Sequence, residues 1–270
     1  MSKLTCDPKD KVIVVTGGAH GIGCGLVKAF HEAGAKHVII ADMDIDKAKE
    51  VASEVSGTAW QLDVSDEKAI ADMINTIEKD IGPIDLYFSN AGVLFTDAPD
   101  WNAYTQTTAQ WQKIWEINVL AHVHASRALL PLMKARGHGA FMITASAAGL
   151  LSQIGDAAYS TTKHAALGYA EALAITHSDD GLYFGVVCPQ AVESNMTKGA
   201  EGSSAALDGI LTAAEFAKRT IDGMRAGQFM IRPHEQVVEY FKHKAGDYDR
   251  WIGGMRKLRR MVMSNKGLPI

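Results

Sequence analysis

A tyrosine and a lysine four residues apart, Tyr159 and Lys163, are the side chains of this sequence best suited to moving a proton. On a helix this spacing places both side chains on one face. A free tyrosine has a pKa of about 10 and is a poor base at neutral pH, whereas a nearby cation lowers that pKa. The pair therefore predicts an acid–base tyrosine supported by an ammonium. The same spacing is common on ordinary helix surfaces, so it gains weight only from further signals.

A glycine-rich turn, Thr16–Gly23, follows the first apolar run of the chain. Gly17 allows a tight turn, Gly21 lets the backbone approach a pyrophosphate, and Gly23 lets the next helix pack close to the strand. The N–H groups at the start of that helix, beside Ile22, would then face the phosphates. The turn predicts a dinucleotide site, with plain packing glycines as the alternative.

The expected dinucleotide is NAD rather than NADP. Asp42 lies nineteen residues beyond Gly23, after a second apolar run, where a carboxylate can accept both ribose hydroxyls and would repel a 2′-phosphate. The alternative is that Asp42 only caps the following helix. His20 is the one basic group in the loop that could touch a phosphate.

The elements that must position these residues alternate along the whole chain. Short apolar runs predict strands at Val12–Val15, His37–Ala41, Thr58–Leu62, Leu86–Ser89, Ala140–Thr144 and Tyr183–Val187. Helical patterns lie between them at Gly21–Gly34, Asp44–Val55, Asp66–Ile81, Thr108–Arg136 and Ala157–Thr176. Strands that are apolar on both sides, separated by helices, predict an α/β fold: a single doubly wound, Rossmann-like parallel sheet with helices on both faces.

No linker or internal repeat divides the chain. We therefore expect one catalytic, NAD(P)-binding domain over residues 1–233 and a helical C-terminal extension over residues 234–270. Residues 199–209 are small and predict a flexible loop. In the extension, Trp251, Ile252, Met255, Leu258 and Val262 fall on one helical face, opposite Arg250, Arg256, Lys257, Arg259 and Arg260. Such a stripe favours docking on the domain, over the pocket, or on a neighbouring subunit; a membrane surface is the alternative.

Composition excludes several classes of function. With 27 Lys and Arg against 31 Asp and Glu, the net charge of −4 predicts no nucleic-acid partner. The polar start and the lack of a long apolar run predict neither a secretion signal nor an integral membrane segment. Three widely spaced cysteines without a C-x-x-C pair favour a reducing compartment, the cytoplasm, and indicate neither a disulfide framework nor a metal site.

Over about residues 10–232 the sequence resembles the short-chain dehydrogenase/reductase family. The resemblance lies in six motifs that occur in the family's order: Thr16–Gly23, Asp63-Val64, Asn90-Ala91-Gly92, Asn118, Ser146, and Tyr159 with Lys163. It implies an NAD-dependent oxidoreductase that interconverts a secondary alcohol and a ketone by hydride transfer.

The resemblance also implies a role for each matched residue. Ser146 hydrogen-bonds the substrate oxygen, Tyr159 passes the proton, Lys163 binds the nicotinamide ribose, and Asn118 anchors a relay water. Asp63 and Val64 would contact the adenine, and Asn90, Ala91 and Gly92 would form a turn beside the cofactor. Singly, Asp63 could equally be a helix cap, Asn90 a turn former and Asn118 a polar spot in a long helix.

The sequence departs from the family pattern after the sixth expected strand. Where P-G-x-V-x-T is usual, it has Pro189-Gln190-Ala191-Val192-Glu193-Ser194. We expect Pro189 and Val192 still to contact the nicotinamide. Gln190 in place of glycine removes backbone freedom and brings an amide towards the substrate.

The substrate loops favour a largely apolar alcohol or ketone, whether aliphatic, cyclic, aryl or sterol-like. Residues 93–104, 148–156 and 191–211 supply Leu94, Phe95, Trp101, Leu150, Leu151, Ile154, Met196 and Leu207, with no Arg or Lys before Lys198. These side chains could instead pack the loops down.

Two other readings use the same fold. A non-catalytic NAD-binding regulatory or scaffold protein has no chemical need for the intact set of Asn118, Ser146, Tyr159 and Lys163. An epimerase or dehydratase relative would carry a different glycine spacing and a larger substrate domain. Family habit favours a homodimer or homotetramer built on the helices expected at Thr108–Arg136 and Ala157–Thr176.

Overall fold

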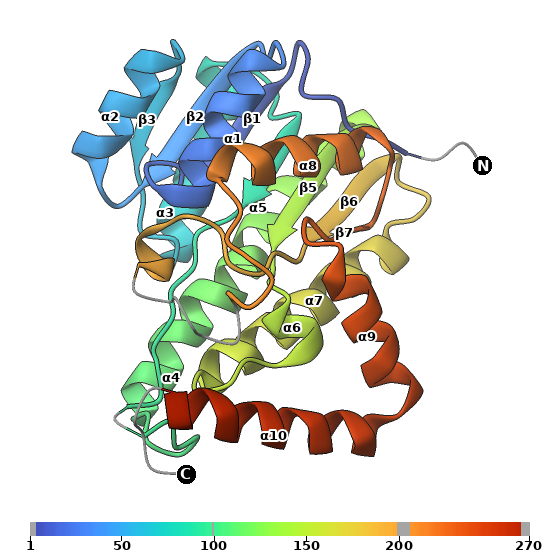
Figure 1. Cartoon of the computed structure of the whole chain (residues 1–270). Coiled ribbons are helices and arrows are strands. Elements are labelled where there is room, and N and C mark those ends of the chain that lie inside the picture. The colour runs from blue at the N-terminus through green and yellow to red at the C-terminus, as the bar shows by residue number, and fades with distance from the viewer. Residues whose placement is uncertain (1–3, 99, 199–205, 266–270) are drawn as a thin grey trace.

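The computed structural model describes residues 4–98, 100–198 and 206–265 and contains one parallel sheet (Figure 1). Its strands are β1 (Val12–Thr16), β2 (His37–Asp42), β3 (Thr58–Gln61), β4 (Leu86–Ser89), β5 (Gly139–Thr144), β6 (Leu182–Val187) and β7 (Met230–Ile231). They lie in the order β3-β2-β1-β4-β5-β6-β7, so the chain winds to one edge, returns across β1 and winds to the other. The predicted doubly wound sheet is confirmed.

Helices cover both faces of the sheet, which is why its central strands are buried throughout. Three helices pack on one face: α1 (Gly21–Glu32), α2 (Ile45–Glu54) and α8 (Ala213–Arg225). On the other face lie α3 (Glu67–Asp80), α5 (Ala121–Arg136) and α7 (Ala157–Thr176). Side chains that alternate along β4 serve the two cores in turn, with Phe88 against Phe30 on one face and Tyr87 stacked on Phe141 on the other.

Several elements were not expected from the sequence. A single helix was expected over Thr108–Arg136, but the structure has α4 (Thr108–Trp115), a π-helical turn η1 (Glu116–Leu120) and then α5. The short elements α6 (Ala148–Leu151) and η2 (Asn195–Thr197) were not anticipated, nor were α8 and β7. Most of the flexible loop predicted at 199–209 lies outside the described residues.

The C-terminal extension is helical, as expected, and folds back onto the domain (Figure 1). It consists of α9 (Gln236–Gly246) and α10 (Tyr248–Asn265), and α10 runs along the lower end of the molecule in this view. Asp247 separates the two helices and accepts a hydrogen bond from the backbone N–H of Arg250. No helix in the described part of the chain is long and apolar enough to cross a membrane.

The predicted apolar face of the extension is wrong at two positions. Ile252 points outward, with 40% of its surface exposed, and Arg250 lines the main cavity rather than the opposite face. The break between α9 and α10 sets the direction of α10, which a pattern of apolar spacing alone does not reveal.

Candidate active site

A cavity of about 1100 Å³ opens at the carboxyl ends of the strands, where β1 and β4 lead to opposite halves of the sheet. It is lined by the glycine turn, the turn after β4, the end of β5, the start of α7, the loop after β6, and the extension. Of the residues predicted for the site, it collects Gly17, His20, Gly21, Ile22, Gly23, Asn90, Ala91, Gly92, Ser146, Tyr159, Lys163, Pro189, Gln190 and Val192.

The glycine turn leaves space that side chains would fill. Gly17 has a φ of +64°, and a Cβ there would lie 3.0 Å from the Cα of Ala91. A Cβ on Gly23 would lie only 1.9 Å from the carbonyl oxygen of Gly17. Only glycine fits these positions, and the resulting cradle at the N-terminus of α1 suits the pyrophosphate of a dinucleotide.

Asp42 lies at the end of β2 and holds the glycine turn. Its carboxylate accepts hydrogen bonds from the backbone N–H groups of Ala19 (3.0 Å) and Asp44 (3.0 Å). His20, the basic residue of the turn, pairs with Asp44, with 2.9 Å between Nε2 and Oδ2. Asp42 does not itself line the cavity.

The two residues expected beside the adenine also lie outside the cavity lining. Asp63 accepts hydrogen bonds from the backbone N–H and hydroxyl of Ser65, and these lower its carboxyl pKa. Its Oδ2 lies 3.9 Å from the Nζ of Lys113. Val64 is buried.

The turn after β4 joins three neighbouring strands. Asn90 donates from Nδ2 to the carbonyl of Thr16 (3.0 Å), and its Oδ1 accepts from the hydroxyl of Thr144 (3.0 Å). Ala91 donates its N–H to the Thr16 hydroxyl. Asn90 thus positions the backbone of the site rather than offering its amide to the cavity.

Ser146, Tyr159 and Lys163 meet at the inner end of the cavity, and all three are buried. Ser146 follows β5, and its hydroxyl donates to the carbonyl of Pro189 (3.3 Å) and accepts from the N–H of Ala148 (3.1 Å). Lys163 donates from Nζ to the carbonyl of Thr144 (2.9 Å). Strand β5 and helix α7 therefore bring the three predicted groups together.

Burial controls the protonation of this group. It raises the pKa of Tyr159 to about 12, although a hydrogen bond with Ser146 acts in the opposite direction. It also lowers the pKa of Lys163 to about 8. The ammonium lies 5.6 Å from the centre of the Tyr159 ring. The sequence predicts a tyrosine pKa lowered by a nearby cation and by an oxidised nicotinamide ring, whereas in the protein alone burial is the largest influence and acts in the opposite direction.

Asn118 lies in the π-helical turn and is fully buried, behind the cavity rather than in its lining. Its side chain accepts from the N–H of Val93 (2.9 Å) and donates to the carbonyl of Val93 (2.9 Å) and the hydroxyl of Thr162 (3.2 Å). It thereby joins the loop after β4 to α7. A π-helical turn inside a helix is often found at functional sites.

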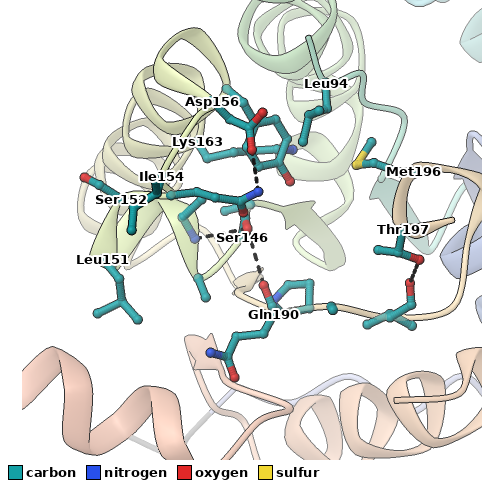
Figure 2. Close-up of a pocket in the computed structure, with 18 of the residues that line it drawn as sticks. Leu94, Ser146, Leu151, Ser152, Ile154, Asp156, Lys163, Gln190, Met196 and Thr197 are labelled. Atoms are coloured by element: carbon teal, nitrogen blue, oxygen red, sulfur yellow. Dashed lines mark hydrogen bonds between the residues drawn. The ribbon is translucent and has the colours of Figure 1, made fainter. Parts of the chain in front are cut away.

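Gln190 points away from Ser146 (Figure 2) and connects the loop after β6 with the extension. Its Nε2 donates to Asp208 (3.0 Å), whose other oxygen accepts from the hydroxyl of Tyr240 on α9 (2.9 Å). Its backbone N–H donates to His234 (3.2 Å). The sequence marked Gln190 as unusual, but no pattern pointed to Asp208 or Tyr240.

The substrate side of the cavity is largely apolar. Six of the eight predicted side chains line it: Leu94, Trp101, Leu151, Ile154, Met196 and Leu207. Phe95 and Leu150 instead pack in the hydrophobic cores. The extension adds Trp251, Met255 and Leu258, together with the basic groups of Lys242, His243 and Arg250. The sequence predicts few charged side chains on the substrate side of the site. The loops agree with this prediction, whereas the extension adds three basic residues to the cavity.

A doubly wound sheet with a glycine cradle and a serine–tyrosine–lysine group in one cavity defines a nucleotide-dependent oxidoreductase. The chain belongs to the short-chain dehydrogenase/reductase family, since the short chain dehydrogenase sequence model matches residues 11–204. It is an oxidoreductase of alcohols and ketones that acts on CH–OH groups with NAD(P).

The chain is also similar to proteins from several organisms. The chain is 35% identical over 196 residues to 1-deoxy-11-beta-hydroxypentalenate dehydrogenase of Streptomyces exfoliatus, covering 70% of each chain. It is 32% identical over 194 residues to meso-2,3-butanediol dehydrogenase of Serratia marcescens, covering 70% of this chain and 74% of that one. A short chain dehydrogenase/reductase from Burkholderia phymatum in complex with NAD has the same fold, with a TM-score of 0.81 and 20% identity over 90% of this chain and 96% of that one.

Proposed function

We propose that this protein interconverts a secondary alcohol and a ketone with NAD as its cofactor, on a substrate that is largely apolar. The observation that supports this most is that Ser146, Tyr159 and Lys163 line the same cavity as the glycine turn. The names of the two relatives described above also refer to hydroxylated carbon skeletons.

In the proposed oxidation, Tyr159 accepts the proton of the substrate hydroxyl while Ser146 donates a hydrogen bond to the same oxygen. A bound NAD would supply the acceptor for the hydride that leaves the carbon bearing this oxygen. Lys163 contacts the ribose and supplies positive charge near the phenol. Asn118 fixes the loop at Val93 through two hydrogen bonds. In the proposed mechanism it also anchors the water that relays the proton. In ketone reduction the proton moves back from Tyr159.

The preference for NAD over NADP rests on Asp42, at the end of β2 where a ribose would lie, and on the pairing of His20 with Asp44. A 2′-phosphate would approach two carboxylates there, with its nearest basic group already engaged. Asp63 and Val64 are proposed to border the adenine, and Asn90, Ala91, Gly92, Pro189 and Val192 the nicotinamide half.

We assign the chemistry to residues 1–233 and the closing wall of the substrate pocket to residues 234–270. The hollow between α5 and α7, lined by Val123, Pro131 and Tyr169 among others, is the surface on which we propose that a homodimer or homotetramer forms, and the molecular mass in solution would test this. The three free thiols, two of them buried, are consistent with a cytoplasmic location.

The replacement Tyr159→Phe tests the catalytic assignment. Because general acid–base catalysis contributes about 10²–10⁴-fold, kcat should fall by at least about 100-fold. NAD affinity, measured by fluorescence titration, should change less than about threefold, a free-energy difference below about 0.7 kcal/mol.

Tyr104→Phe, at a tyrosine that is 80% exposed, is the matched control and should keep full activity. Substantial turnover by Tyr159→Phe would show that another group carries the proton. Tight NAD binding with no turnover of any alcohol or ketone by the wild-type protein would instead favour the non-catalytic regulatory alternative.

A further inference from the structure

Asp156 stands at the N-cap position of α7 but does not cap the helix. An aspartate in this position ordinarily accepts a hydrogen bond from a backbone N–H of the first turn. Here the N–H of Ala157 is bound instead by Oδ2 of Asp97 (2.9 Å), a buried residue whose Oδ1 is fixed by Gln106 (2.7 Å). The carboxylate of Asp156 is therefore released from the structural role that its position predicts.

One oxygen of this carboxylate is left without a partner. Asp156 is only 5% exposed, and its Oδ2 accepts a hydrogen bond from Nε2 of Gln153 (2.5 Å). Its Oδ1 is buried and meets no donor in hydrogen-bond geometry among the described residues, although the hydroxyl of Thr96 is close enough to the carboxyl group to lower its pKa. Burial also raises the pKa of Asp156 to about 6. An unpaired buried oxygen is costly, and proteins keep few of them outside functional sites.

The same carboxylate borders the reaction centre. Asp156 lines the cavity together with Tyr159, three residues further along the chain, and its negative charge helps to raise the pKa of the Tyr159 phenol. In the view of Figure 2, the side chain of Asp156 is drawn above that of Ser146, in the same cavity as Leu94 and Lys163. The wall of this part of the cavity holds the apolar side chains of Leu94 and Ile154 as well as the polar ones of Gln153 and Thr96.

We propose that Asp156 binds a second hydroxyl group of the substrate, so that the preferred substrate is a diol or hydroxyketone with an otherwise apolar body. The inference rests on the proposed function and specifies its substrate class. A carboxylate accepts hydrogen bonds and cannot donate them, so its ligand must be a donor. A substrate carboxylate would meet like charge, and an ammonium would share the cavity with Lys163 and the charged nicotinamide ring. A neutral hydroxyl a few bonds from the reacting carbon can donate a hydrogen bond to Oδ1 of Asp156 without charge repulsion from the carboxylate, from Lys163 or from the nicotinamide ring.

The test compares cyclohexanol with its 1,2-, 1,3- and 1,4-diols, and 2-octanol with 2,3-octanediol, by following reduced nicotinamide. In the wild-type protein, kcat/KM for at least one diol should exceed that of its matched monoalcohol by about tenfold or more, the effect of about 1.4 kcal/mol. Asp156→Leu should reduce this ratio by about tenfold, because leucine offers no acceptor. Asp156→Asn, whose amide oxygen still accepts, should retain part of it.

Asp46→Leu, at an exposed carboxylate on α2, is the matched control and should leave the ratio unchanged. Because each ratio is taken within one variant, a general loss of activity cancels, and Asp156→Asn serves if Asp156→Leu does not fold. If the wild type turns over monoalcohols but shows no preference for diols, the inference is wrong while the proposed function stands. The same holds if the diol ratio of Asp156→Leu equals that of the wild type. If neither alcohols nor ketones are turned over, the proposed function fails and this inference with it.

Discussion

At the scale of single residues, the site places ionisable groups where burial opposes their charged forms. Tyr159, Lys163 and Asp156 lie within two turns of α7, and in each case desolvation is the largest influence on the pKa. We therefore expect Tyr159 to stay a phenol at neutral pH until positive charge, such as that of an oxidised nicotinamide ring, enters the cavity. This arrangement favours proton transfer in the filled site over chance deprotonation in the open one.

Asp42 is expected to set the cofactor preference. In Asp42→Ser the carboxylate that would repel a 2′-phosphate is gone, so the NAD-to-NADP ratio of kcat/KM should fall by about tenfold or more, about 1.4 kcal/mol. The ratio is measured with one alcohol at both cofactors. Since Asp42 also binds the N–H groups of Ala19 and Asp44, a modest loss of thermal stability should accompany the change. A wild-type protein that already prefers NADP would contradict this prediction.

Asp156 is expected to cost the protein stability at neutral pH. Its pKa is about 6 in the folded protein, raised by burial from an ordinary value of 3.8, so the folded state binds this proton more tightly than the unfolded chain. The penalty is therefore absent below about pH 4, grows as pH rises towards 6, and is complete above it, with an upper limit of about 3 kcal/mol. Asp156→Asn should be more stable than the wild type at pH 7 but not at pH 4.

Thermal or urea unfolding between pH 4 and 8 measures this difference in the free energy of unfolding. Asp46→Asn removes one charge from an exposed site and controls for the change in net charge. A difference between Asp156→Asn and the wild type that does not vary with pH would contradict the prediction. If Asp156→Asn is more stable than the wild type but has a smaller ratio of diol to monoalcohol turnover, the wild-type protein gives up stability in order to recognise its substrate.

At the scale of elements, α7 shows which structural features can be predicted from the sequence and which cannot. Its length, its apolar pattern and the spacing of Tyr159 and Lys163 were all readable, because they depend on local periodicity. The sheet followed from the alternation of strands and helices for the same reason. The role of Asp156 was not readable, because it depends on Asp97, nearly sixty residues away, taking over the cap of α7.

Most of the elements missed in the sequence lack a local signal of their own, but α8 does not: Thr212 and Glu215 form a capping box at its start, and its apolar side chains recur at helical spacing. Strand β7 has two residues, and the π-helical turn occurs within a continuous helical pattern. The inward turn of Arg250 follows from the break at Asp247. The bridge from Gln190 through Asp208 to Tyr240 joins three segments far apart in the chain, so only their packing reveals it.

Lys244 is expected to attach α9 to the domain. It is buried, and its Nζ donates to the carbonyl of Leu150 at the end of α6 (2.6 Å). Lys244→Met keeps the apolar stem but leaves this carbonyl without a donor, at a cost of about 1–3 kcal/mol. Hydrogen exchange should therefore quicken in α9 and α10, by about tenfold for each 1.4 kcal/mol of lost stability, while the strands stay protected.

The matched control is Lys242→Met, two residues away on the same helix. Lys242 is exposed, and within the described part of the chain its ion pair is with Glu239 at the surface, a contact worth about 0–1 kcal/mol. Uniform acceleration throughout the sheet in Lys244→Met would mean that the extension is part of the global core rather than a separately opening wall.

At the scale of the whole molecule, the cavity has two walls of different origin. Residues before 234 supply the glycine turn and the Ser146, Tyr159 and Lys163 group that we propose for catalysis, whereas α9 and α10 line the side that we propose for the substrate (Figure 1). The two walls are joined by the Gln190, Asp208 and Tyr240 bridge and by Lys244. Substrate selection can therefore change with the extension while the chemistry remains in the domain.

Removal of α10 should separate these two properties. A chain ending at Asp247 loses Trp251, Met255 and Leu258 from the cavity wall but keeps α9 with its Lys244 anchor. Burial of one large apolar side chain is worth about 1.5–3 kcal/mol, so the preference for a large apolar alcohol over a small one should fall by about tenfold or more. The affinity for NAD should hold, because none of the lost side chains lies beside the glycine turn. A chain ending at Asn265 keeps all of α10 and is the control. If the shorter chain keeps the full preference, the wall formed by α10 does not contact the substrate, and selection belongs to the loops of the domain alone.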